Sequence, residues 1–302
     1  MILQFYYKMR GEYFTLRLYS YGVKERKEKK EKEKMKKLTK ILTCVMCAML
    51  VVPFTLAFAA CGGKTNDNKV TVSGSSSVTP IMEKLAAEYE KTHDVRITVN
   101  MSSSGAGISD TQNGLNDFGM SSRALKDGET GVTGETLCMD GIALIVSNDN
   151  EVSDVKKEDV KALFEHGTAI PGTAITAAIG RDASSGTRSA FDELLEIKNG
   201  YHASVATLAE TGNVIEAIKN SPVSIGYISY GSLGSSVKAV SLDGVACTVE
   251  NIKNNTYALQ RPFVIVLKEG AELSEAAKGF YDYIMSEEAQ TIIAGAGYIS
   301  VK

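Results

Sequence analysis

Residues 70–89 read VTVSGSSSVTPIMEKLAAEY, and this stretch contains the pattern from which the fold of the chain can be predicted. Val70 and Val72 alternate with polar residues, which predicts a β-strand. The Gly/Ser run at 74–77 breaks the alternation, and from Pro80 onward apolar residues recur at helical spacing. A strand, a short loop and a helix therefore follow one another directly.

The same order of strand, loop and helix recurs along the rest of the chain. Alternating apolar residues predict a strand over 95–101, and a continuous apolar run predicts a buried strand at 142–146. A strand at 175–179 leads into a loop at 181–187, after which a helix begins. Strands that alternate with helices predict an α/β fold with largely parallel sheets. Further helices are expected at 156–165, 214–219, 273–285 and 287–294, and further strands at 225–229 and 263–267.

Three of these strands end in clusters of Ser, Thr and Gly, at 74–77, 103–107 and 184–187. In α/β units, the loop at the carboxyl end of a strand faces the ligand crevice. The helix that follows offers unpaired N–H groups and the positive end of its dipole to an anion. On its own, each cluster is more typical of helix caps and turns. Three clusters together, with Arg181 beside one of them, predict a site for a small anion.

Arg181 narrows the class of anion that such a site would take. A guanidinium offers paired donors in a fixed plane, which match two oxygens of a tetrahedral oxyanion. The alternative role for this arginine is a salt bridge between two domains. We expect an oxyanion site that contains Arg181, with the salt bridge left open.

The charge distribution excludes one large class of partners. The chain has 302 residues, enough for two domains, and the composition of an ordinary globular protein. Residues 1–60 hold 13 of the 33 basic and 5 of the 36 acidic side chains, so the remainder carries a net charge of −11. Nucleic-acid binding needs a broad basic surface, and we therefore exclude it.

The first part of the chain has the composition of an export signal. Residues 24–37 are almost all charged, and 41–60 is an uncharged run that ends in small residues before Cys61. A basic stretch, an apolar stretch and small residues at a cut site are typical of a secretory signal peptide. Because the sequence from Met35 already supplies a complete basic region, we interpret 35–60 as the signal peptide.

Residues 1–34 are interpreted as an upstream extension that is not native, because with them the signal would be longer than usual. The end of the signal resembles a bacterial lipoprotein box, which implies a lipid such as palmitate on Cys61. Residues 61–67 would then form a tether at the membrane. An uncleaved membrane anchor and an ordinary secretory cut are the alternatives.

Little in the exported part of the chain indicates a metal site or an enzyme. Cys138 and Cys247 remain there, and both a disulfide and two free thiols are open. The three histidines share no ligand spacing, so we expect no metal and no cofactor. No G-x-S-x-G motif is present, and without a nucleophile paired to a base we expect no enzymatic activity.

Six motifs follow one another in order: GSSSVTP (74–80), SSSGAGI (102–108), DFGMSSR (117–123), DGIALIV (140–146), RDASSGTRSAF (181–191) and IGYISYG (225–231). Together they resemble the motifs of the phosphate-binding lipoproteins that serve ABC-type phosphate importers. The resemblance implies a two-lobed α/β fold of the periplasmic-binding-protein type, type II, with phosphate clamped between the lobes. It implies that lobe 1 comprises 68–143 and 262–302, and that lobe 2 comprises 144–261.

The resemblance also implies which residues would touch phosphate. Ser122 departs from the family pattern, because better-known members have an aspartate there that accepts the proton of phosphate. A hydroxyl can donate or accept, so selectivity for phosphate over sulfate is left open. Asp140 is a candidate for the missing acceptor, and a turn aspartate is the alternative. The residues carried over are Ser76, Ser77, Ser104, Arg181, Ser185, Gly186 and Thr187, joined by Ser122 and Asp140.

These inferences predict a lipid-anchored receptor on the extracytoplasmic face of the cell membrane. It would capture inorganic phosphate and present it to the permease of an ABC transporter, without any covalent step. The alternatives are a receptor for another tetrahedral oxyanion, such as sulfate or molybdate, and a surface adhesion or signalling protein on the same scaffold.

Overall fold

The structure is a computed structural model that describes residues 68–302. The predicted extension (1–34), signal peptide (35–60), tether (61–67) and lipidated Cys61 all lie outside the described residues. Among the helices of the described part, none combines the length and the apolar character needed to cross a membrane.

Strands and helices alternate along the described chain, and the predicted α/β fold is confirmed. The strands are β1 (Lys69–Ser75), β2 (Arg96–Ser102), β3 (Phe118–Ser121), β4 (Val132–Ser147), β5 (Asp154–Val155), β6 (Ala177–Arg181), β7 (Ala206–Leu208), β8 (Ser224–Ser229), β9 (Val237–Leu242), β10 (Gln260–Lys268) and β11 (Ile299–Ser300). The helices are α2 (Thr79–Glu90), α3 (Ser104–Asn113), α4 (Lys157–His166), α5 (Gly186–Leu194), α6 (Thr211–Lys219), η1 (Tyr230–Ser232), α7 (Val249–Lys253), α8 (Glu275–Ile284) and α9 (Glu287–Gly295).

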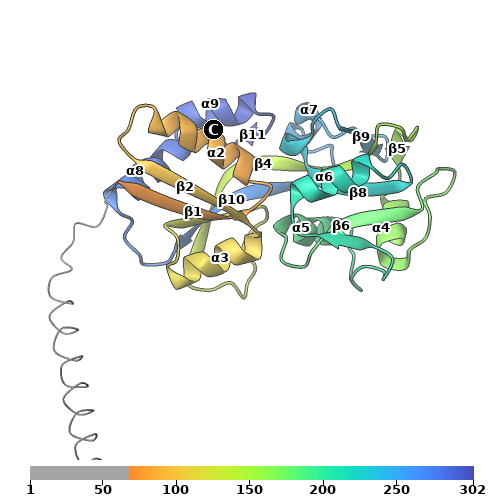
Figure 1. The fold of residues 1–302 in the computed structure, drawn as a ribbon, viewed down its shortest axis with the longest axis horizontal. Coiled ribbons are helices and arrows are strands. Elements are labelled where there is room, and N and C mark those ends of the chain that lie inside the picture. The colour runs from red at the N-terminus through yellow and green to blue at the C-terminus, as the bar shows by residue number, and fades with distance from the viewer. Residues whose placement is uncertain (1–67) are drawn as a thin grey trace, which may run out of the picture. The chain divides into compact units, whose positions relative to one another are not determined.

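The two largest hydrophobic clusters are separate, and they divide these elements into two lobes (Figure 1). The core of lobe 1 is built from residues between 70 and 138 and between 263 and 298, including α2, α8 and α9. The core of lobe 2 is built from residues 142–259. The boundaries drawn from the sequence, after 143 and after 261, fall inside β4 and β10 and stay a prediction.

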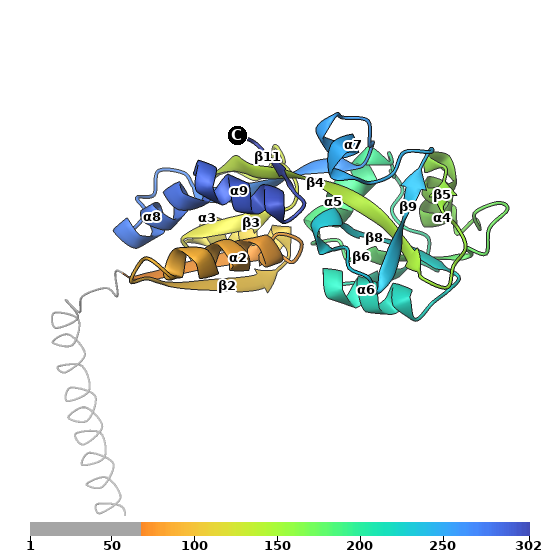
Figure 2. The same ribbon diagram turned by 90° about the horizontal axis from the view of Figure 1, so that it is seen from above.

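The two lobes are joined through β4 and β10, which Figure 1 labels. Figure 2 shows β4 extending from one lobe into the other. The first part of β4 pairs antiparallel with β10 in lobe 1, and from Ile142 onward β4 pairs with β8 and β9 in lobe 2. Parallel pairing is confirmed for β1 with β2 and β3, and for β6 with β7 and β8. The expectation of largely parallel sheets does not extend to β4 and β10. These two strands pair antiparallel with each other, β10 also pairs antiparallel with β3, and β4 with β8 and β9.

Local sequence explains where the helices nearest the site begin. Pro80 lies in the first turn of α2, where its missing N–H is not needed. The Ser103 side chain accepts a hydrogen bond from the Ala106 N–H and caps α3, and Ser185 accepts one from the Arg188 N–H and caps α5. Capping is therefore part of what these serines do.

Candidate anion-binding site

The three Ser/Gly loops predicted from the sequence meet between the lobes. Because β1 and β2 are parallel neighbours, the loops at their carboxyl ends lie side by side, and the Ser76 N–H donates to the Ser102 carbonyl at 3.1 Å. The loop after β6 reaches them from lobe 2, where the Ser184 carbonyl accepts the Gly105 N–H at 3.2 Å. The structure therefore brings together loops from distant parts of the sequence, with Ser77 and Thr187 separated by 110 positions.

Six buried hydroxyls form the centre of this meeting point, and we call them the hydroxyl cluster. Ser77 Oγ lies 2.9 Å from Thr187 Oγ1, which joins lobe 1 to lobe 2. Ser104 Oγ lies 3.2 Å from Ser122 Oγ and accepts the Ser122 N–H at 3.0 Å. The cluster consists of Ser76, Ser77, Ser104, Ser122, Thr187 and Thr211, all at most 5% exposed.

Arg181 lies beside the hydroxyl cluster at the end of β6 and is 1% exposed. Its Nη2 donates to Ser76 Oγ at 3.0 Å, and its Nη1 donates to Thr211 Oγ1 at 3.2 Å. The other acceptors of the guanidinium are the carbonyls of Leu208 and Ala209. All of these partners are neutral oxygens.

The charge of Arg181 is therefore buried without an ionic partner. Within residues 68–302, no carboxylate comes within ion-pair distance of this guanidinium, so the alternative of a salt bridge between domains is not found. Burial lowers the pKa of Arg181 from its usual value, which reflects the cost of holding the cation there. A buried charge is stable only when it is paired, so this position favours an anion.

Gly186 allows the two lobes to approach closely at this point. A Cβ atom added to Gly186 would lie 2.1 Å from Ser104 Oγ and 2.8 Å from Ser122 Oγ. Ser185, the preceding residue, is buried, and its side chain caps α5 by accepting the Arg188 N–H at 3.3 Å. Both residues lie where the sequence predicted the third loop.

Asp140 is the predicted site residue that the structure keeps apart from the hydroxyl cluster. Its Oδ2 accepts hydrogen bonds from Arg261 Nε at 3.3 Å and Nη2 at 3.2 Å, and its Oδ1 accepts one from Ser229 at 3.0 Å. Burial raises the pKa of Asp140 to about 6, against the opposing influence of Arg261 and Ser229. Arg261 links Asp140 to the cluster, because its Nη1 donates to the Ser122 carbonyl at 3.1 Å.

The Asp140–Arg261 pair gives a prediction about stability. Arg261→Met leaves a buried carboxylate without its partner, and we expect the free energy of unfolding to fall by about 3–5 kcal/mol. In the double variant Asp140→Leu/Arg261→Met no charge is left alone, so the loss should be smaller. Chemical denaturation of both variants measures the difference, and a double variant less stable than the single one would contradict this account.

Two residues near the site, Thr211 and Arg261, were not predicted from the sequence. Thr211 opens α6 directly after β7, and its hydroxyl contacts Ser76 Oγ at 3.3 Å and Ser77 Oγ at 3.4 Å as well as Arg181. The pair Thr211-Gly212 repeats the pattern of the other loops and could have been found by it. No local pattern of this kind marks Arg261, because its partner Asp140 lies 121 residues earlier in the sequence.

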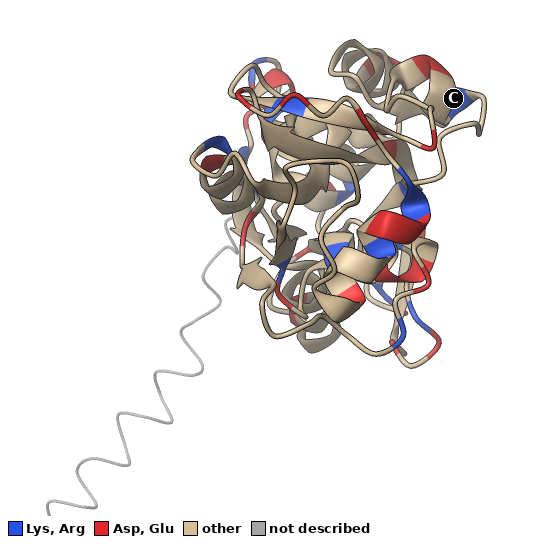
Figure 3. Cartoon of the chain, turned by 90° about the vertical axis from the view of Figure 1, so that its right-hand side faces the viewer, with Lys and Arg blue, Asp and Glu red and all other residues tan. Residues whose placement is uncertain are grey.

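The two cysteines of the described chain lie in the hydrophobic cores. Cys138 and Cys247 are free and buried, each in a different core, and burial raises the pKa of both thiols. No group of three or more His, Cys, Asp or Glu suited to a metal ion occurs within the described residues. Figure 3 shows basic and acidic residues interspersed on one side of the molecule.

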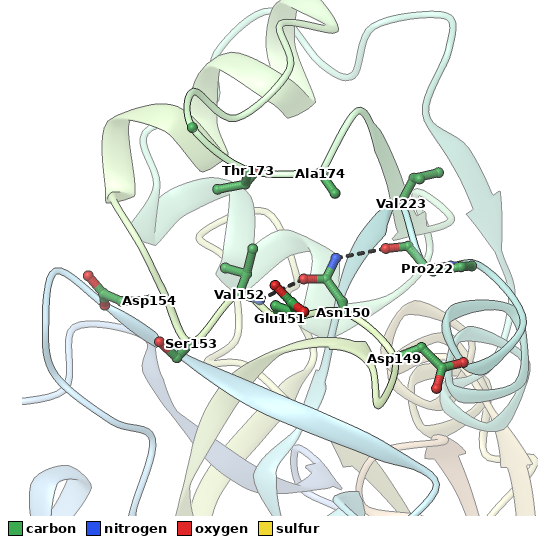
Figure 4. Close-up of a pocket in the computed structure, with 11 residues that line it drawn as sticks. Asp149, Asn150, Glu151, Val152, Ser153, Asp154, Thr173, Ala174, Pro222 and Val223 are labelled. Carbon is green, nitrogen blue, oxygen red and sulfur yellow. Dashed lines mark hydrogen bonds between the residues drawn. The ribbon is translucent and has the colours of Figure 1, made fainter.

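A hollow of about 590 Å³ lies elsewhere in lobe 2 (Figure 4). It is lined by residues 149–154, 172–174, 222 and 223, and none of the predicted site residues is among them. Asn150 closes one part of it by donating to the Pro222 carbonyl at 2.7 Å. Its charged lining residues are Asp149, Glu151 and Asp154, so this hollow would repel an anion.

Comparisons with known proteins identify the family. The model of the PBP superfamily domain matches residues 59–288. The phosphate-binding protein PstS of Bacillus subtilis is 28% identical over 285 residues, which cover 84% of this chain and 92% of that protein. The PstS 2 proteins of two Streptococcus agalactiae strains are 42% identical over 130 residues. In this last match the chain spans less than half (44%) of the length of its relatives.

Solved structures agree with the sequence matches. A phosphate ABC transporter substrate-binding protein from Clostridium perfringens, solved with bound phosphate, is 36% identical, with a TM-score of 0.74 over 78% of this chain and 100% of that chain. An ABC-type phosphate transport receptor from Vibrio cholerae is 31% identical, with a TM-score of 0.64 over 76% of this chain and 99% of that chain. The chain thus belongs to the PBP superfamily, among the substrate-binding proteins of phosphate ABC transporters.

Proposed function

We propose that this protein captures inorganic phosphate outside the cytoplasm and delivers it to an ABC importer. The observation that carries the proposal is the buried guanidinium of Arg181, which is surrounded by neutral oxygens and pairs with no described carboxylate. A tetrahedral oxyanion would neutralise this charge and accept hydrogen bonds from the hydroxyls around it. The names of the relatives in Bacillus subtilis, Clostridium perfringens and Vibrio cholerae support phosphate as that anion.

Capture would depend on donors from both lobes. Ser76, Ser77, Ser104 and Ser122 belong to lobe 1, whereas Arg181, Thr187 and Thr211 belong to lobe 2. A ligand that contacts both groups stabilises the closed arrangement of the lobes relative to the open one. Nothing in this process makes or breaks a covalent bond, so the protein acts as a receptor and not as an enzyme.

For the site itself, we propose that the hydroxyl cluster and Arg181 contact the anion, with Gly186 and the capped start of α5 beside them. We assign Asp140 to Arg261 and not to the ligand, because both of its carboxylate oxygens already accept hydrogen bonds. The P–OH group of phosphate would then donate its hydrogen bond to a hydroxyl oxygen such as that of Ser122, because a hydroxyl can either donate or accept.

Calorimetric titration of the purified protein with phosphate, sulfate and molybdate tests the proposed function. We expect the tightest binding for phosphate. Tighter binding of sulfate or molybdate would reassign the protein as a receptor for another oxyanion, and binding of none of the three anions would reject an oxyanion receptor altogether.

We also propose that a lipid on Cys61 anchors the protein at the extracytoplasmic face of the cell membrane. Cys61→Ala removes the modified sulfur, so we expect the protein to move from the membrane fraction to the soluble fraction. Cys47→Ala, which changes a cysteine within the apolar run, is the matched control and should leave the distribution unchanged. Retention of the Cys61→Ala variant in membranes would indicate that the apolar run is an uncleaved anchor.

A further inference from the structure

Arg181 is paired with β7 on one side, opposite Leu208, but the strand on its other side, β8, does not extend as far as Arg181. β6 pairs with β8 over Ala177–Ile179, and the register ends two residues before Arg181. At Arg181 the backbone N–H donates to the hydroxyl of Tyr227 at 3.0 Å. The Tyr227 hydroxyl thus accepts the hydrogen bond that a backbone carbonyl of a paired strand would otherwise accept.

Tyr227 is held in its own position by burial and by contacts with Phe191 and Tyr201. It is fully buried, and its ring stacks on Phe191 with centroids 3.9 Å apart and an angle of 14° between the planes. Its hydroxyl lies 2.8 Å from the hydroxyl of Tyr201. Burial raises the pKa of Tyr227 above its ordinary value, so the phenol stays protonated and neutral.

The carbonyl of Arg181 is held by the same group of residues. Arg188 Nη1 donates to the Arg181 carbonyl at 3.1 Å, and the Arg188 guanidinium lies over the Tyr201 ring, 4.0 Å from its centroid. Tyr227 therefore holds the Arg181 N–H and Arg188 holds its carbonyl, while Tyr201 contacts both Tyr227 and Arg188. We call Tyr227, Tyr201 and Arg188 the backbone clamp. None of these three residues belongs to the hydroxyl cluster.

We propose that Tyr227 is a positioning residue for anion binding, which acts by holding the Arg181 backbone so that the guanidinium is aimed at the ligand before the ligand arrives. The inference rests on the proposed function, because it assigns a role within the same site. Paired hydrogen bonds from a guanidinium depend on its direction as well as its distance. A backbone that is already ordered has less freedom to lose on binding, which improves affinity.

Tyr227→Phe tests this role, because it removes one oxygen and keeps the ring that stacks on Phe191. The Arg181 N–H then lacks its acceptor, and we expect phosphate to bind about tenfold more weakly. Tyr257→Phe is the matched control, since Tyr257 is equally buried in lobe 2 and donates to the Ile142 carbonyl at 2.8 Å. It should lose comparable stability while its dissociation constant for phosphate stays within about twofold of wild type.

Two further measurements separate positioning from a general loosening of lobe 2. In an Arg181→Ala background, Tyr227→Phe should have no further effect on the dissociation constant, because the group that it positions is gone. In the ligand-free protein, the Arg181 amide should exchange its hydrogen faster in Tyr227→Phe than in Tyr257→Phe. This exchange experiment needs no ligand, so its result is independent of the proposed function.

Equal weakening of phosphate binding by Tyr227→Phe and Tyr257→Phe would overturn the inference. So would a Tyr227→Phe effect that persists in full in the Arg181→Ala background, or equal hydrogen-exchange rates of the Arg181 amide in the two variants. The proposed function fails on a different observation, the absence of phosphate binding by the wild-type protein.

Discussion

Arg181→Ala is expected to weaken phosphate binding by a factor of about 30 or more. Within the described residues, this guanidinium is the only cation that donates to a hydroxyl of the cluster, because Arg261 reaches only the backbone carbonyl of Ser122. The other acceptors of Arg181 are neutral carbonyls. Removing a charged donor from a buried anion costs about 2–5 kcal/mol, and each 1.4 kcal/mol corresponds to a tenfold change. Calorimetric titration with phosphate measures the change directly.

Arg181→Ala is not expected to reduce the folding stability of the ligand-free protein in the same way. Because Arg181 is a buried charge without a carboxylate partner, its removal relieves a desolvation cost, and we expect the ligand-free variant to remain folded. Arg96→Ala, which removes an exposed cation at the far end of β2, is the control for net charge. Phosphate affinity that is unchanged in folded Arg181→Ala would show that the ligand is held elsewhere.

The sequence was sufficient to predict the parts of the site that repeat a local pattern. A Ser/Gly cluster between an alternating apolar stretch and a helical one is readable because strand, loop and helix are all determined by neighbours in the chain. The loops at 74–77, 103–107 and 184–187 do meet in the structure. The meeting of the first two loops could be expected, because the carboxyl ends of the parallel neighbours β1 and β2 lie at one edge of a sheet. The third loop follows β6 of lobe 2, and its approach to the other two depends on how the lobes face each other.

What could not be predicted depends on contacts between distant segments. In the sequence, no basic partner is evident near Asp140. In the structure, β10 places Arg261, which is 121 residues further along the chain, next to its carboxylate. The role of Tyr227 arises because β6 continues beyond the end of its pairing with β8, which leaves the Arg181 N–H to bond with the phenol. The point at which strand pairing ends cannot be read from composition. The antiparallel return of β10 along β4 was missed because the first half of β4 lacks a continuous apolar run.

Gly186→Ala is expected to weaken phosphate binding strongly, although it adds only a methyl group. The new Cβ would lie 2.1 Å from Ser104 Oγ and 2.7 Å from Ser104 Cβ. The hydroxyl can rotate away, but the Ser104 Cβ is fixed to the backbone of α3, so the lobes themselves must separate. Overpacking of this kind costs about 1–3 kcal/mol, which corresponds to a loss of about 5- to 150-fold.

The physical reason that this cost falls on binding is that Gly186 and Ser104 belong to different lobes. Separation of the lobes removes the clash, so Gly186→Ala should leave the stability of each lobe unchanged while it disfavours the arrangement in which both lobes contact the ligand. Gly212→Ala is the matched control, because Gly212 also lies in the first turn of a lobe 2 helix and its added Cβ would meet nothing within 4 Å. Equal phosphate affinities for the two variants would mean that capture does not require the close approach of Gly186 to Ser104, and that the anion is bound by the donors of one lobe alone.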